Sequence, residues 1–156
     1  MGVSGQISKS GEWEHLHLFG DINEDADVYF PTLLTALGKN VVVNFKEVTS
    51  INSCGVRAWI TFLREFETGR SIKFEECTPE IISQINMIPN FRGKSTITSV
   101  YAGYTCQNCG HPQLHLFTRD VNMPTSADAG AGDVQCKKCS KTTEMDELEE
   151  EFFAWI

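Results

Sequence analysis

The stretch that decides the fold is residues 41–56, with the sequence VVVNFKEVTSINSCGV. It opens with the continuous β-branched run Val41-Val42-Val43. A run without polar alternation is typical of a strand buried on both faces, as in a parallel sheet. From Val56 to Phe66, large apolar residues recur at helical spacing, which indicates a helix with one buried face. The stretch therefore predicts a buried strand, a short connection and an amphipathic helix.

The connection between these two elements holds a helix-start signal. Asn52 and Ser53 both suit the N-cap position, because their side-chain oxygens accept a hydrogen bond from the free N–H groups of the first turn. Either residue can therefore be the cap. The same N–H groups and the helix dipole favour an anion near Ser53.

The residues on both sides repeat the strand and helix patterns in alternation. Predicted strands lie at 6–9, 13–19, 41–43, 71–74 and 96–101, and predicted helices lie around 31–37, 56–66 and 79–88. The first of these helices has Pro31 in its first turn and Gly38 as its C-terminal cap. The alternation predicts an α/β fold with parallel crossovers around a central sheet.

Four of the six cysteines form two CxxC pairs in the last third of the chain. The pairs are Cys106 with Cys109 and Cys136 with Cys139. Two residues between thiolates let one tight turn point both sulfurs at one ion, and two such turns supply the tetrahedral four-thiolate shell that zinc takes. A shell of four cysteines leaves no open position for a substrate. We therefore expect one structural Zn²⁺ per chain.

Two other uses of these pairs stay open, as redox-active dithiols or as ligands of an iron–sulfur cluster. The gap of 26 residues between Cys109 and Cys136 is longer than in common zinc ribbons. It has room for a strand at 113–118. His111 and His115 lie near enough in sequence to replace a ligand, but the pattern favours exposed polar positions for both.

The remaining cysteines, Cys54 and Cys77, stand alone. We interpret each as a small buried residue rather than a nucleophile. The sequence contains no serine-hydrolase elbow, no Walker loop and no HExxH motif. We therefore expect a protein that is not an enzyme. The alternative is a redox or metal-dependent enzyme built on the cysteines, and metal analysis would distinguish the two.

Charge argues against several classes of partner. The net charge is −8, and residues 100–156 hold nine acidic and four basic groups. Nucleic acids and anionic membranes bind clustered lysine and arginine, so neither is expected as a partner. The chain has no apolar run of about 18 residues, and its first residues lack the basic and apolar segments of a secretion signal. We expect a cytoplasmic protein without membrane insertion.

With its neighbours, the stretch at 41–56 resembles the core motif of STAS domains, the anti-sigma factor antagonists and their relatives. In that family a hydrophobic strand leads to Asp-Ser-Ser-Gly-Leu, or a close variant, at a helix start. Residues 20–23, Gly-Asp-Ile-Asn, resemble the family's Gly-x-Leu-Asp turn, and residues 78–81, Thr-Pro-Glu-Ile, resemble the start of its next helix. The resemblance covers about residues 5–101.

The resemblance implies a regulatory module that binds proteins and is not an enzyme. Antagonists of this family bind a kinase-type anti-sigma factor, and phosphorylation of the serine after the motif's Asp releases the complex. By the same match, the phosphorylation candidate is Ser53, and the partner-binding residues are Asn23, Asn52, Ser53, Cys54 and Gly55. A phosphate adds about −1.5 to −2 charges, which would disrupt an acidic or apolar contact.

Three positions depart from the family pattern. Asn23 and Asn52 stand where the family has Asp, and Cys54 stands where it has a second serine. With two carboxylates changed to amides, the switch can be lost while the docking surface is kept. The alternative function is therefore an accessory STAS-like subunit of a transporter or a larger signalling complex, without a phosphorylation switch.

Together these features predict two parts. A STAS-like α/β domain, with a central sheet and packed helices, occupies residues 1–101. A zinc-ribbon-like extension occupies residues 102–156. From Thr143 helical spacing resumes, with Leu148, Phe152 and Trp155 near one face and glutamates elsewhere, so we expect the extension to end in an acidic amphipathic helix.

Overall fold

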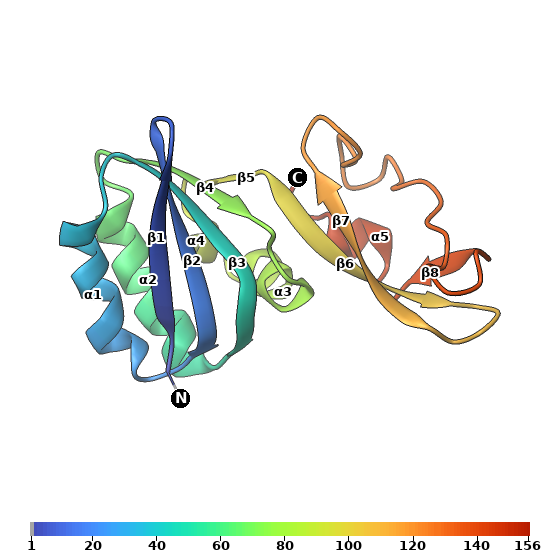
Figure 1. Cartoon of the computed structure of the whole chain (residues 1–156), viewed down its shortest axis with the longest axis horizontal. Helices are drawn as coiled ribbons and strands as arrows, with labels where there is room; N and C mark the ends of the chain where they lie inside the picture. The colour runs from blue at the N-terminus through green and yellow to red at the C-terminus, as the bar shows by residue number, and fades with distance from the viewer. Residues whose placement is uncertain (1) are drawn as a thin grey trace.

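Residues 2–156 form two β-sheets that lie end to end in the structure, a computed structural model (Figure 1). The first sheet and its helices comprise β1 (Ser4–Ser10), β2 (Trp13–Ile22), α1 (Ala26–Ala36), β3 (Asn40–Ile51), α2 (Ser53–Phe66), β4 (Ser71–Glu75), α3 (Pro79–Met87), α4 (Pro89–Arg92) and β5 (Thr96–Ile97). The second sheet and its helix comprise β6 (Ser99–Cys106), β7 (Pro112–Thr118), β8 (Thr143–Met145) and α5 (Glu149–Phe152). The predicted α/β class is confirmed.

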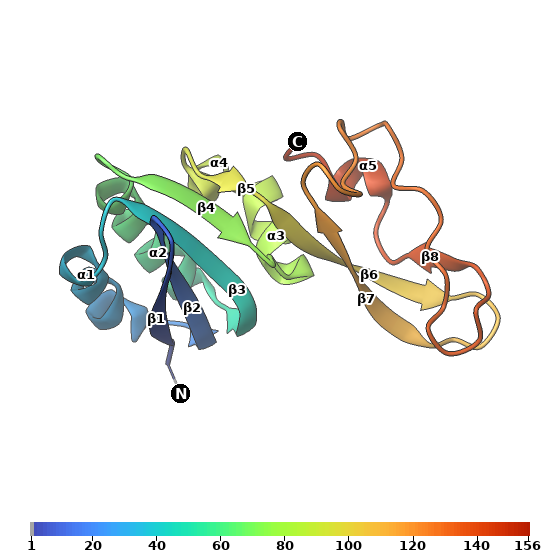
Figure 2. The ribbon, with the colours of Figure 1, turned by 45° about the horizontal axis from the view of Figure 1, so that its top comes forward.

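The first sheet has the strand order β1-β2-β3-β4-β5. The β1–β2 pair is antiparallel, and the other three pairs are parallel. Parallel neighbours need a crossover rather than a tight hairpin. The segment with α3 and α4 connects β4 to β5, and α1 and α2 are the crossovers of the other two pairs. Both helices lie on one face of the sheet (Figures 1 and 2). Val41 and Val43 of the central strand β3 are fully buried, as the β-branched run predicts.

Aromatic rings fill the space between this sheet and its helices. Trp59 of α2 is fully buried, and its indole N–H donates to the Phe91 carbonyl at 2.8 Å. The rings around it, with centroids 5.4 to 5.9 Å away, belong to Phe30, Phe45, Phe62, Phe74 and Phe91. Rings at such distances and inclined to one another stabilise a core beyond their buried area. The first sheet therefore packs against the aromatic centre of a core that continues into the second sheet.

The second sheet has the order β7-β6-β8, with both pairs antiparallel. The β6–β7 hairpin carries the first cysteine pair at its turn, and β8 follows the second pair. Phe117 of β7 packs edge-on against Phe153 with 5.3 Å between ring centroids. This sheet therefore packs against the residues that follow it at the end of the chain.

The two sheets meet where the chain passes from β5 to β6. The predicted single strand at 96–101 is wrong, because these residues belong to two strands in different sheets. At Thr98 both the backbone N–H and the side-chain hydroxyl donate to the Phe74 carbonyl, at 2.8 and 3.0 Å. These bonds hold the bend between the strands. The predicted domain boundary between residues 101 and 102 lies inside β6, and the division into two domains stays a prediction.

Helix α1 begins before its predicted start. It runs from Ala26, so Pro31 lies inside the helix rather than in its first turn. The C-cap is Leu37, and Gly38 does not have positive φ. The carbonyls at this helix end are bound instead by Arg70, whose guanidinium donates to the oxygens of Leu34, Leu37 and Gly38. A distant arginine thus replaces the local cap that the sequence suggests.

The acidic tail also differs from its predicted form. Residues 143–145 pair with β6 as strand β8, and the helix is a single turn, α5. The spacing of apolar residues suits a helix, but packing against the rest of the molecule determines the conformation here. Within residues 2–156, none of the helices combines the length and the apolar character that crossing a membrane requires.

Candidate docking edge and four-cysteine centre

The residues predicted to bind a partner come together at one end of the first sheet. The parallel strands β2 and β3 end at Ile22 and Ile51, which are register partners. The next residues, Asn23 and Asn52, therefore leave the sheet side by side, and the Asn52 N–H donates to the Ile22 carbonyl at 3.1 Å. We call Asn23 together with residues 52–55 the α2 edge.

Asn52 is the residue that caps α2. Its backbone is extended, and its side-chain oxygen accepts a hydrogen bond from the Gly55 N–H at 2.8 Å. Ser53 and Cys54 lie in the first turn and are both exposed. Of the two predicted caps, Asn52 fills the position, and the Ser53 hydroxyl faces solvent. The interpretation of Cys54 as a buried residue is wrong, whereas Cys77 is fully buried as predicted.

The glycine of the motif is required by close packing of α2 against β2. A Cβ atom at Gly55 would lie 1.9 Å from the Ile22 carbonyl oxygen. No side chain fits at that distance, so only glycine lets the helix start against the end of β2. The spacing of the α2 edge therefore depends on Gly55.

Carboxylates that the motif does not predict surround the α2 edge. Glu24 accepts a hydrogen bond from the Asn52 side-chain amide at 3.3 Å, and Glu80 of α3 accepts one from the Ile51 N–H at 3.3 Å. Asp21 accepts hydrogen bonds from the hydroxyls of Thr49 and Ser50, and these hold the pKa of its carboxyl below the usual value.

The Glu24 carboxyl also has a lowered pKa, because its own backbone N–H and then the Asn52 amide donate to it. The site therefore keeps negative charge near Ser53 although Asn23 and Asn52 are amides. Sequence reasoning missed these residues. The available signal was their position, since Glu24 follows Asn23 and Glu80 lies within the Thr-Pro-Glu-Ile helix start.

The four cysteines of the two CxxC pairs converge as predicted. Their sulfur atoms all lie within 4.8 Å of one another, although the pairs are far apart in sequence. The shortest approaches join the two turns: 3.5 Å from Cys106 Sγ to Cys139 Sγ, and 3.7 Å from Cys109 Sγ to Cys136 Sγ. These separations suit four sulfur ligands around one ion with metal–sulfur distances of about 2.3 Å.

The two turns have matching backbone geometry. The Gly110 N–H donates to the Cys106 carbonyl at 3.0 Å, and the Ser140 N–H donates to the Cys136 carbonyl at 2.9 Å. Gly110 and Ser140 have φ of +74° and +63°. Gly110 adopts this conformation readily, because glycine has no Cβ atom. Ser140 adopts it without being glycine, so the second turn is held against the preference of its residue type.

Backbone N–H groups point at the sulfur atoms. The N–H groups of Asn108 and Cys109 donate to Cys106 Sγ, both at 3.4 Å, and Lys138 N–H donates to Cys136 Sγ at 3.3 Å. The bond from Cys109 is the main reason that the pKa of the Cys106 thiol falls to about 6. Such bonds stabilise thiolates, the form that binds metal.

One thiol of the cluster has a pKa that is raised rather than lowered. A backbone N–H from His111 favours the Cys109 thiolate, but burial and the neighbouring sulfurs outweigh it and raise the pKa of Cys109 to about 11. Four thiolates this close repel one another unless a cation lies between them. In the described part of the chain no histidine joins the cluster, so His111 and His115 are not ligands in this arrangement.

Comparisons with known proteins find similarity among solved structures alone. No protein-family model matches the chain, and no curated protein matches it. Among solved structures, the chain is similar to the structure described as the anti-sigma factor antagonist SpoIIAA in its unphosphorylated form. The identity is 18%, the match covers 60% of this chain and 86% of the other, and the TM-score is 0.41.

Proposed function

We propose that this chain is a non-enzymatic regulatory module that binds another protein through the α2 edge, in the manner of the anti-sigma factor antagonists. The observation that carries the proposal is the exposure of Ser53 and Cys54 on the first turn of a helix whose position is fixed by Asn52 and Gly55. A partner can reach these side chains without rearrangement. The motif resemblance supports a kinase-type anti-sigma factor as that partner.

Affinity capture from the native host tests this function. Wild-type protein should recover a kinase-like protein, and Ser53→Arg, which adds bulk to the α2 edge, should lose it. Ser8→Arg is the matched control, because Ser8 is exposed on β1 at the far side of the sheet from α2. Equal capture by the wild type and by Ser53→Arg would show that the partner binds elsewhere.

We propose further that Ser53 is the site of any phosphorylation switch. The free N–H groups at the start of α2 support a phosphate there. A phosphate would also meet the nearby Glu24, and this repulsion would loosen the α2 edge and release a partner. The switch is excluded if no Ser53 phosphopeptide is found under any growth condition and Ser53→Asp binds its partner as the wild type does.

The second candidate function is an accessory subunit of a transporter or a signalling complex, with docking but no switch. It is favoured by Asn23 and Asn52, which are amides at the two positions where the family motif has carboxylates. The same capture experiment separates the two functions. Recovery of transporter ATPase subunits, with equal binding by Ser53→Asp, would support the accessory role.

The four-cysteine centre is proposed to hold one structural Zn²⁺ through Cys106, Cys109, Cys136 and Cys139. The clustering of the sulfurs and the N–H groups that point at them support this ligand set. When bound, zinc supplies folding free energy to a segment with a small core. Elemental analysis should find one zinc per chain, lost in Cys136→Ser and kept in Cys54→Ser. Iron in its place, or thiol-dependent catalysis, would support the alternatives.

A further inference from the structure

The last nine residues of the described chain fold back onto the helices of the first sheet. We call residues 148–156 the C-terminal clamp. It includes α5, which contacts α3. The clamp buries three large rings: Phe152 and Phe153 are each 1% exposed, and Trp155 is 9% exposed. The end of the extension thus contacts the other part of the molecule.

Two side chains of the first part hold the clamp by its backbone. The Asn86 amide, at the end of α3, donates to the carbonyls of Glu151 and Phe152, both at 3.1 Å. The Arg92 guanidinium, at the end of α4, donates to the Trp155 carbonyl at 2.7 Å and lies 5.8 Å from the Trp155 ring. We call this surface, made by the ends of α3 and α4, the α3–α4 corner.

The contact between clamp and corner is imperfect. The Asn86 side-chain oxygen and the Trp155 indole nitrogen are both buried, and neither has a hydrogen-bond partner within residues 2–156. A buried polar atom without a partner opposes the contact that buries it. Ordering nine residues also costs conformational entropy of the same order as the gain from burying three rings. The clamp therefore depends on what holds the chain just before it.

The segment before the clamp is held by the four-cysteine centre. The Cys136 N–H donates to the Lys141 carbonyl at 2.8 Å, and Thr143 N–H donates to the Val134 carbonyl at 3.1 Å. Thr143 is also the register partner of Cys106. Strand β8 therefore begins four residues after Cys139, and only Asp146 and Glu147 separate its end from the clamp.

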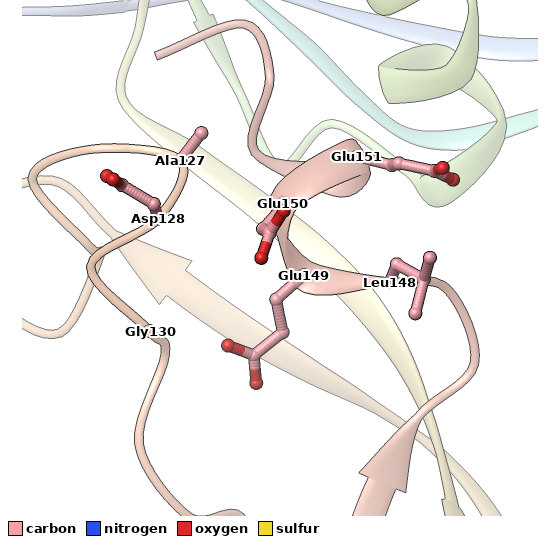
Figure 3. A pocket seen from close by; sticks show the side chains of 7 residues that line it. All are labelled: Ala127, Asp128, Gly130, Leu148, Glu149, Glu150 and Glu151. Carbon is pink, nitrogen blue, oxygen red and sulfur yellow. The ribbon is translucent and has the colours of Figure 1, made fainter.

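A hydrogen bond from the loop before Cys136 also connects the clamp to the four-cysteine centre. The Ala131 N–H, in the loop that leads to Cys136, donates to the Glu149 carboxylate at 3.1 Å. Figure 3 shows Glu149 on the side of α5 that faces this loop, across a recess of about 240 Å³, and Glu151 on the other side. The loop that leads into the second cysteine turn therefore contacts α5, and the strand that leaves this turn, β8, leads to α5.

We propose that metal at the four-cysteine centre holds the C-terminal clamp closed on the α3–α4 corner, so that occupancy of the centre decides whether the corner is covered. The inference rests on the zinc site of the proposed function. Without metal, the cysteine turns and β8 lose their anchor, and their ordering cost then opposes closure. Glu80 of α3 accepts a hydrogen bond from the N–H of Ile51, the residue directly before the α2 edge, so one short helix contacts both the clamp and the end of the strand that leads into the α2 edge.

Hydrogen exchange on the full chain tests the effect of metal. In the zinc-loaded protein the amides of Phe152 and Phe153 should be protected. After chelation under reducing conditions they should exchange at least about tenfold faster, while the amides of α2 stay protected. Unchanged exchange of the clamp would overturn the proposal, and so would loss of protection throughout the first sheet.

Linkage supplies a test that does not remove the metal. If zinc favours closure, then opening the clamp must weaken zinc binding by the same factor. The double variant Asn86→Ala, Arg92→Ala changes no cysteine, and its zinc affinity, measured by competition with a chromophoric chelator, should fall about tenfold. The control Gln84→Ala, Lys94→Ala changes the same helix and the same loop region without touching the clamp, and should bind zinc as the wild type does.

The outcomes separate this proposal from the proposed zinc site. A wild-type chain that binds one zinc, with an unchanged affinity in the double variant, overturns the clamp and keeps the metal site. A chain that binds no zinc overturns both. A loss of affinity in the control pair as large as that in the double variant also overturns the clamp, because the effect would then not arise from the contacts to residues 148–156.

Discussion

The two sheets of this molecule are stabilised in different ways. The first sheet surrounds Trp59 with five aromatic rings and covers one face with α1 and α2. The second has three strands, of which β8 has only three residues, and it holds its turns by N–H groups donated to sulfur. The first part therefore packs its sheet against a dense aromatic core, whereas we propose that the second part depends on a bound metal and on its neighbour. Stability should respond to different changes in each part.

Metal removal should give the largest effect, confined to the second part. Structural zinc contributes apparent free energies of about 10–16 kcal/mol in small zinc domains. Chelation should therefore disorder the chain from about Cys106 onward while residues 5–101 stay folded. Heteronuclear NMR should show loss of dispersion for the amides from about Cys106 onward, including those of the C-terminal clamp, while the amides of the first sheet stay dispersed. If the whole chain melted together, the contrast between the sheets would be wrong.

Trp59→Ala should give the next largest effect, confined to the first part. The change removes a fully buried ring and its hydrogen bond to the Phe91 carbonyl, so the free energy of unfolding should fall by about 3–5 kcal/mol. Urea denaturation followed by circular dichroism measures it. Trp13→Ala is the control: Trp13 is half-buried beside Lys73, 4.1 Å from the ring, outside the aromatic core. An equal loss in both variants would contradict the central role of Trp59.

The sequence predicts the first part better than the second, for a physical reason. The β-branched run at 41–43 and the helical spacing of apolar residues in α2 indicate burial in a large core. In such a core the pattern of apolar residues determines which segments form strands and which form helices. In the tail the same spacing predicts a helix from Thr143, but pairing with β6 and contacts to Asn86 and Arg92 give a strand and one helical turn. Tertiary contacts of this kind leave no local pattern.

The candidate functional sites show the same limit of prediction from sequence. The four cysteines and the motif residues at 52–55 are visible because their spacing is itself the signal. Glu24 and Glu80 are not, since they reach the α2 edge only through the pairing of β2 with β3 and the placement of α3. Arg70 likewise binds carbonyls that lie more than thirty residues earlier.

Gly55→Ala tests the α2 edge within the first part. The added Cβ would meet the Ile22 carbonyl oxygen at 1.9 Å, so α2 must move away from β2. Overpacking of this kind costs about 1–3 kcal/mol, and the α2 edge should also lose its partner. Thermal unfolding and partner binding measure the two effects. Cys54→Ala, at the exposed neighbour, should leave the unfolding temperature unchanged and is the control for stability. A Gly55→Ala protein as stable as the wild type would contradict the close approach.

Arg70→Ala should cost about 1.5–3 kcal/mol, the range for hydrogen bonds to charged groups. Its guanidinium binds carbonyls at the end of α1 and the Phe66 carbonyl at the end of α2, so the variant leaves several acceptors without a donor. Arg64→Ala is the control, because Arg64 is exposed in the last turn of α2. Equal unfolding midpoints for the two variants would show that solvent replaces Arg70 fully.

The smallest expected effect lies at the junction of the two sheets and appears only in acid. Glu76 follows β4 with φ of 48°, and its carboxylate accepts hydrogen bonds from Tyr101 of β6 at 2.6 Å and from Asn44 of β3 at 3.0 Å. Burial opposes its charge, but these bonds together with Lys46 and His17 outweigh burial and hold the pKa of Glu76 below its usual 4.5.

A carboxyl whose folded pKa is lowered stabilises the fold above its unfolded pKa, and this contribution is lost as the pH falls through the folded value. Wild-type stability should therefore decline below about pH 4.5 more steeply than that of Glu76→Gln, with thermal unfolding between pH 3 and 6 as the measurement. Above pH 5 the variant should be the less stable of the two. If the difference between them stayed constant across this range, the ionised Glu76 would not contribute to joining the second sheet to the first.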